Sequence, residues 1–322
     1  MKPLLVPLSP YLSEVPWGGA ALQRHFGVDA PLDRKIGEAW VISAIPGKAS
    51  RVLGTGQPLD EVWRGHEAHF LGPGTPPGTP FPFLVKLLAT EQPLSVQVHP
   101  DDATAERLEG SGPGKHEAWV VLRARHGAEI LIDLVPGATR EQLVACAAAS
   151  DGDGVRGCLG RIEPCAGDVI DLRPGTVHAP GAGLVLFEVQ QQSDVTYRVF
   201  DWNRLGLDGK PRLLHVDKAK ATIVSGAPRL SRLAEMGSPC ERVLNASTFS
   251  IERWVPANGA HIPITSLAGI TCVAGRGTLS AGGGDPVDLA PGRAVLVPRA
   301  ATMVEARGDG IVLLVARPAR RA

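Results

Sequence analysis

The sequence has few aromatic residues, no long apolar run and no excess of charge of either sign. Aromatic residues make up 5% of the 322 residues, whereas glycine (38) and proline (28) are abundant. This composition fits many short strands joined by turns better than it fits a helix bundle. A chain of this length can bury a large core, as two domains or as one elaborate β domain.

The balanced charge and the missing apolar runs exclude several classes of partner. Lysine and arginine total 33, as do aspartate and glutamate, so no basic field recruits nucleic acid or an anionic membrane. No apolar run approaches the roughly 20 residues that span a bilayer, and early prolines interrupt any signal peptide. We therefore expect a small-molecule partner, with no nucleic acid and no membrane, and a monomer or weak homodimer.

The five cysteines form no CxxC pair, and their number is odd. A zinc ribbon needs CxxC pairs, and a disulfide framework normally uses an even number of cysteines. The pattern favours a reducing compartment, so we expect a cytoplasmic protein.

A predicted strand over residues 94–99 carries polar groups on a face that normally holds hydrophobic ones. Side chains alternate along a strand, so Ser95, Gln97 and His99 point one way while Val96 and Val98 point the other. Gln97 and His99 can offer an amide oxygen and an imidazole to a metal ion. The alternative is a half-exposed edge strand whose polar face meets water.

Two later segments can supply the remaining ligands. In the strand that begins at Lys115, Glu117 shares a face with Lys115, and His116 points the opposite way. His178 follows a strand and a tight turn. One carboxylate, two imidazoles and one amide suit a single divalent metal; zinc is our first choice, and manganese or iron(II) also fit. The predicted ligands are Gln97, His99, Glu117 and His178.

Two charged residues interrupt otherwise apolar strands. Lys86 lies within the apolar run 83–88, and a buried lysine needs a counter-charge or a chemical role, unless it reaches solvent at an edge. Glu38 lies in the predicted strand 36–43, where we interpret it as one member of a structural ion pair.

Residues 59–70 have the spacing of apolar side chains that predicts a helix.

The order of the ligands resembles the metal centre of cupin barrels, a jelly-roll form of closed antiparallel β structure. A more specific resemblance is carried by motifs between about residue 16 and residue 204, namely PWGG, IGEAWVIS, PFLVKLLATEQPLSVQVHPDD, GKHEAWVVL, PGTVHA and QQSDVTYRVFDWNR. In these motifs the chain resembles the type I mannose-6-phosphate isomerases (phosphomannose isomerases) of the short bacterial form. The segments QVHPDD and SDVTYR are distinctive of that family, whereas PWGG is not.

The resemblance implies a mainly β protein of two cupin (jelly-roll) barrels with a few short helices. We expect a catalytic, metal-binding domain over residues 1–234 and a metal-free, cupin-like domain over 235–322. The final third repeats part of the sequence pattern of the first half, and in that alignment Met303 falls opposite His178. Residues 262–284 contain no histidine or acidic residue that could replace the other ligands.

The resemblance also implies a metal-dependent isomerase that interconverts mannose 6-phosphate and fructose 6-phosphate through an enediol-type intermediate. It assigns catalysis to Arg198 and Lys86, and substrate contacts to Ser95, Lys115, Asp194 and Arg204. Three proton carriers stay open: Lys86 with a pKa lowered by burial and nearby positive charge, Glu117, or a metal-bound water. Salt bridges that anchor turns are the alternative role of the two arginines.

The sequence departs from the family pattern at two places, and two other functions stay open. The turn before His178 reads Arg173-Pro174-Gly175 where the family usually has Pro-Ala-Gly, and His116 replaces a small or hydroxylated residue. The other functions are a sugar-binding or regulatory cupin without turnover, and an iron(II) cupin dioxygenase.

Overall fold

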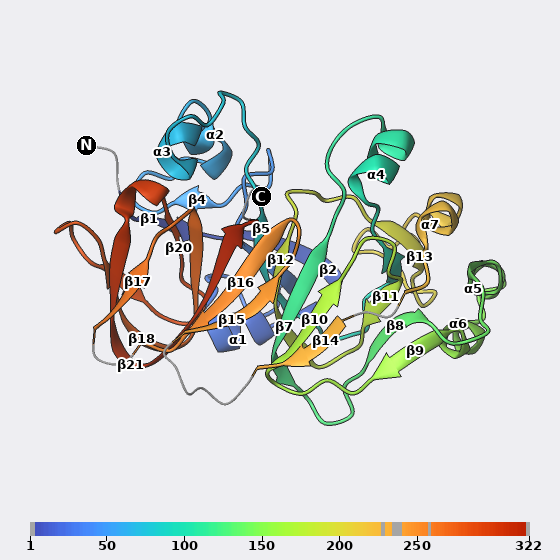
Figure 1. The fold of residues 1–322 in the computed structure, drawn as a ribbon. Helices are drawn as coiled ribbons and strands as arrows, with labels where there is room; N and C mark the ends of the chain where they lie inside the picture. The colour runs from blue at the N-terminus through green and yellow to red at the C-terminus, as the bar shows by residue number, and fades with distance from the viewer. Residues whose placement is uncertain (1–3, 227–228, 234–239, 257–258, 320–322) are drawn as a thin grey trace.

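The computed structural model describes residues 4–226, 229–233, 240–256 and 259–319. Three antiparallel sheets form successive layers, and most of the short helices lie at the periphery (Figure 1). The predicted fold class, mainly β with a few short helices, is confirmed. Within the described ranges, no helix is long and apolar enough to cross a membrane.

The outer and central sheets take alternating strands from the same part of the chain. The outer sheet has the order β13 (Tyr197–Phe200), β6 (Val96–Val98), β11 (His178–Pro180), β8 (Ile130–Leu134) and β9 (Leu159–Ile162). The central sheet has the order β14 (Arg229–Arg232), β10 (Asp168–Leu172), β7 (Glu117–Ala124), β12 (Leu184–Gln190), β5 (Leu84–Ala89), β3 (Ile36–Ile42) and β2 (Tyr11–Gly19).

The C-terminal sheet includes one strand from the start of the chain. Its main order is β15 (Cys240–Asn245), β16 (Phe249–Trp254), β21 (Met303–Pro318), β18 (Ala268–Ser280), β20 (Ala294–Val297), β1 (Val6–Ser9) and β4 (Arg51–Val52). Two further strands pair with β21 and β18, namely β17 (Ala260–Pro263) and β19 (Val287–Leu289). The helices are α1 (Ala21–Phe26), α2 (Leu59–Trp63), α3 (Glu67–Leu71), α4 (Asp102–Glu109), α5 (Arg140–Ala148), α6 (Gly152–Gly157), α7 (Val216–Thr222) and a 3₁₀ turn, Arg299–Ala301.

The central sheet is buried on both faces because its strands pack against both neighbouring sheets. Along β7, Trp119 belongs to the core shared with Ile130 and Ile132 of the outer sheet. The alternate residue Val120 belongs to the core shared with Phe249 of the C-terminal sheet. Strand alternation therefore decides which layer each side chain of β7 meets.

The predicted boundary between the two domains, at residues 234 and 235, lies outside the described residues. Strand β1 pairs with β20, so the first residues of the chain contribute to the sheet built mostly by the last ones. The two barrels, their boundary and the absence of metal from the C-terminal half stay predictions.

The prediction of one continuous helix over residues 59–70 is wrong. Two short helices, α2 and α3, replace it. Gly65 lies between them with a φ of +76°, a left-handed conformation that does not continue an α-helix. The apolar spacing is real, since Leu59, Trp63 and Phe70 all enter the core.

The packing between the central and C-terminal sheets generates a stability prediction. Phe83 is fully buried, and a Cβ added at Gly269 of β18 would come within 3.0 Å of its ring. We expect Phe83→Ala to lower the free energy of unfolding by about 3–5 kcal/mol, because it removes buried surface and leaves a cavity. Leu207→Ala, at a side chain 52% exposed, should change it by less than about 0.5 kcal/mol. Urea unfolding of both variants is the measurement, and equal losses would contradict the packing.

Candidate metal centre

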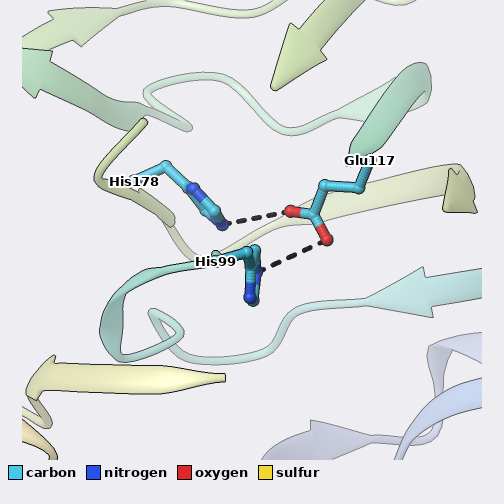
Figure 2. A group of neighbouring side chains, drawn as sticks. All are labelled: His99, Glu117 and His178. Atoms are coloured by element: carbon cyan, nitrogen blue, oxygen red, sulfur yellow. Dashed lines mark ion pairs between the residues drawn. The ribbon is translucent and has the colours of Figure 1, made fainter. Parts of the chain in front are cut away.

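Two facing sheets bring three potential metal ligands together. His99 directly follows β6, His178 begins β11 and Glu117 begins β7. Their ligand atoms all lie within 4.8 Å of one another, and all three residues are buried. Nε2 of His178 is 3.1 Å from one carboxylate oxygen of Glu117, and Nε2 of His99 is 3.5 Å from the other (Figure 2).

Backbone carbonyls orient both imidazoles. Nδ1 of His99 lies 2.9 Å from the carbonyl oxygen of Val195, and Nδ1 of His178 lies 2.9 Å from that of Thr176. A carbonyl oxygen only accepts, so each Nδ1–H donates and each Nε2 presents its lone pair towards Glu117. Metal-ligating histidines are typically held in this way by their second nitrogen.

Electrostatics keep these side chains in the protonation states that a metal requires. Burial and the Lys115 ammonium lower the pKa of His99 to about 4, so the imidazole is neutral at neutral pH. Burial alone would raise the pKa of Glu117, but opposing influences, of which the Lys115 ammonium is the largest, hold that pKa well below its usual value. Lys115 Nζ lies 2.6 Å from Glu117 and 3.1 Å from His99 Nε2. One carboxylate and two imidazoles fit a divalent ion such as zinc.

The fourth predicted ligand, Gln97, lies beside this group in β6. Gln97 is opposite His178 of β11 on one side and opposite Arg198 of β13 on the other. Its amide nitrogen is 3.3 Å from His178 Nε2. Rotating the terminal amide turns its oxygen in that direction instead, so its role as a ligand stays a prediction.

The strand and turn geometry agrees with the alternation expected from the sequence. Ser95 is buried at the start of the ligand strand. His116 points away from the metal ligands, with Nε2 2.6 Å from Asp171 and its ring against Phe249. In the turn that departs from the family pattern, Gly175 has a φ of +88°, and its N–H donates to the carbonyl of His99 over 2.8 Å.

Lys86 has counter-charges that the sequence analysis did not identify. Its Nζ is 3.1 Å from Glu188 and 4.0 Å from Glu38, and it lies 4.7 Å from the centre of the Trp40 ring. Burial alone would lower the pKa of Lys86, but the two carboxylates outweigh it and raise the pKa above its usual value. The condition under which Lys86 would be the proton carrier, a pKa lowered by nearby positive charge, is therefore not met, because carboxylates and not cations lie next to the amine.

Glu188 is the most informative residue that the sequence analysis missed. It lies opposite Lys86 across the β12–β5 pair and accepts a hydrogen bond of 2.7 Å from the indole N–H of Trp119. Glu188 lies inside the largely apolar segment 184–190, just as Lys86 lies inside the apolar run 83–88. In both cases the sequence indicates a buried charge that needs a partner. Buried charges of opposite sign in two strands predict a pair only once the strands are known to be neighbours.

The remaining predicted site residues divide into paired and available groups. Arg204 donates to Asp201 over 2.6 Å and to the carbonyl of Pro93, so the turn-anchoring alternative holds for it. Asp194 pairs with Lys48, which the sequence analysis also missed. Arg198 donates to the carbonyl of Leu213 over 2.8 Å. Across the described part of the chain it forms no ion pair with a carboxylate, so its guanidinium remains available for an anion.

Comparison with known proteins agrees with this geometry. Residues 5–134 match the sequence model of the type I phosphomannose isomerase catalytic domain. The mannose-6-phosphate isomerase of Streptococcus mutans is 35% identical over 273 residues, which are 83% of this chain and 84% of that protein. The chain belongs to the type I phosphomannose isomerase family. The metal-dependent isomerase function expected from the sequence is thereby confirmed at the level of the family, and the dioxygenase and non-catalytic alternatives are not favoured.

Solved structures of isomerases of this kind share the fold. The mannose 6-phosphate isomerase from Bacillus subtilis is 31% identical and superposes with a TM-score of 0.86, over 98% of this chain and all of that one. A phosphomannose isomerase variant from Salmonella typhimurium is only 18% identical, yet it superposes with a TM-score of 0.79. The second comparison supports the fold alone.

The lowered pKa of His99 predicts how the stability of the metal-free protein depends on pH. Between pH 6.5 and about 4, the unfolded state binds a proton at this residue and the folded state does not. Stability therefore falls with acidification, by about 2 kcal/mol for this group between roughly pH 7.5 and pH 5. Denaturant unfolding at several pH values measures it. His99→Gln should show a shallower fall, and parallel curves for the two proteins would contradict the assignment.

Proposed function

We propose that the protein interconverts mannose 6-phosphate and fructose 6-phosphate at one zinc ion bound by His99, Glu117, His178 and Gln97. The observation that carries the proposal is the buried convergence of one carboxylate and two imidazoles within 4.8 Å. Relatives that carry the name mannose-6-phosphate isomerase support the choice of substrate.

The reaction moves a proton between C1 and C2 of the open-chain sugar, and negative charge develops on the neighbouring oxygens. When bound, the divalent metal supplies a Lewis acid that stabilises this charge. Lys115 lies 2.6 Å from Glu117 and adds a fixed ammonium next to the ligands. We assign contacts with the sugar oxygens to Lys115, which contacts Glu117 and His99, and to Ser95, which strand alternation places on the face of Gln97.

Lys86 acts in this proposal as a cation close to the reacting carbons. The carboxylates of Glu188 and Glu38 keep its amine protonated. A protonated amine cannot accept the proton from the sugar, but it stabilises a developing oxyanion. Its burial strengthens that interaction, because water does not screen it.

Arg198 holds the phosphate group of the substrate. The chain carries no net charge, so recognition of a phosphate depends on cations concentrated near the metal ligands. A guanidinium without a carboxylate partner offers a forked pair of donors, the geometry that binds phosphate best. The position of Arg198 opposite Gln97 supports this role.

The state of the cysteines bears on the location of the protein in the cell. All five cysteines are free, and free thiols persist in a reducing compartment, which supports a cytoplasmic location. A monomer or weak homodimer remains the expected state.

Metal content tests the ligand assignment. We expect one zinc ion per chain in the parent, and almost none in His99→Ala or His178→Ala, because each substitution removes an imidazole from the centre. His126→Ala removes an exposed histidine and should keep its metal. Elemental analysis of the purified proteins gives the answer, and full metal content in both ligand variants would overturn the assignment.

Turnover tests the roles of Arg198 and Lys86. The parent should isomerise mannose 6-phosphate in a coupled assay. Arg198→Ala should lose about 1.5–3 kcal/mol of charge-assisted binding, which is roughly one to two decades in kcat/KM. Lys86→Met should lose turnover while it still binds substrate.

Metal content and thermal unfolding serve as controls for folding, and Arg64→Ala, at an exposed arginine, should match the parent. Parental activity in Arg198→Ala would remove this residue from the site. A zinc-loaded parent without isomerase activity would favour the sugar-binding alternative.

A further inference from the structure

A single amide side chain connects the two segments that carry His99 and Glu117. Gln191 directly follows β12, and its Oε1 accepts a hydrogen bond of 2.8 Å from the backbone N–H of His116. Its Nε2 donates over 2.9 Å to the carboxylate of Asp102. His116 precedes Glu117 in the chain, and Asp102 lies three positions after His99.

The chemistry of the two partners requires an amide at this position. A backbone N–H can only donate, and an ionised carboxylate can only accept. Gln191 therefore has to present its oxygen to His116 and its NH₂ to Asp102. Glutamate lacks the donor, and an apolar residue of the same length lacks both groups.

Further hydrogen bonds make the connection rigid at both ends. The backbone N–H of Gln191 donates to the carbonyl of His116 over 3.0 Å, so main chain and side chain both contact the Glu117 strand. The same Asp102 oxygen that accepts from Gln191 also accepts from the backbone N–H of Gly114 over 2.8 Å. Val195 lies four residues after Gln191, and its carbonyl oxygen orients the His99 ring.

We propose that Gln191 is a positioning residue of the metal centre, which fixes the separation of His99 and Glu117 and thereby the metal affinity. Ligand positions must be held within roughly half an ångström for tight binding. Groups that hydrogen-bond directly to metal ligands typically contribute 10–100-fold to metal affinity, and Gln191 acts one step further out, on the segments that carry two of the ligands. The inference rests on the proposed function only in taking this metal centre as the catalytic one.

The test exchanges the two groups that face each other. Gln191→Glu keeps the oxygen that accepts from His116 but sets a second carboxylate against Asp102, so zinc should bind about 10-fold more weakly. Adding Asp102→Asn removes the repulsion between two carboxylates, but the oxygen that faces position 191 also accepts from the backbone N–H of Gly114. We therefore expect the double variant to recover part of the lost zinc affinity.

Two other variants complete the design. Gln191→Met removes both hydrogen bonds without adding charge, and it should also weaken zinc binding if Gln191→Glu does not fold. Gln57→Glu makes the same chemical change in an exposed loop, and it should bind zinc as the parent does.

Metal binding is measured without reference to turnover. Competition with a chromophoric chelator gives the zinc Kd, and the visible spectrum of the Co²⁺-loaded protein reports ligand geometry. We expect an altered cobalt spectrum in Gln191→Glu and one closer to the parental spectrum in the double variant. With zinc in excess, kcat of Gln191→Glu should approach the parental value, since the substitution weakens metal binding and not the chemistry.

Parental zinc affinity in both Gln191→Glu and Gln191→Met would overturn the proposal, as would a double variant that binds no better than Gln191→Glu. A parent that binds zinc but does not isomerise the sugar phosphate would refute the proposed function, while the zinc measurements would still decide the role of Gln191.

Discussion

The structure depends on the burial of opposite charges between the outer and central sheets. Glu117 is fully buried, and Lys115, Lys86 and Glu188 are each 5% exposed or less. An unpaired charge in such a place is very unfavourable, whereas breaking a buried pair typically destabilises a protein by about 3–5 kcal/mol. Each of these side chains therefore needs its partner within a few ångströms, and this requirement constrains the register of the strands that carry them.

Strand alternation lets one sheet serve a polar site and an apolar core at the same time. The face of β7 that carries Glu117 also carries Trp119, while the alternate residues Ala118 and Val120 pack towards the C-terminal sheet. His116 follows the second pattern and contacts Phe249 of that sheet and Thr248 just before it. The candidate metal ligands His99, Glu117 and His178 are thus supported from behind by a layer that adds no residue to this group.

The cations around the centre differ in how firmly they are held. Lys86 and Lys115 pair with buried carboxylates, and Arg204 pairs with Asp201. Arg198 contacts only a carbonyl among the partners described for it, so binding an anion requires no ion pair to break. In a chain without net charge, this difference in pairing distinguishes Arg198 from the other cations near the centre.

The sequence by itself determined those features that follow from local periodicity. Alternation along residues 94–99 places Gln97 and His99 on one face, and the same rule separates Glu117 from His116; the mainly β fold follows from composition. Only the tertiary structure decided which charges meet, because Glu188 and Lys86 lie about a hundred positions apart and become neighbours through the β12–β5 register. A pKa depends on such partners, so the sequence left the direction of the pKa shift of Lys86 open. Hydrogen bonds from a loop, such as those of Gln191, depend on the same long-range packing and leave no periodic signal.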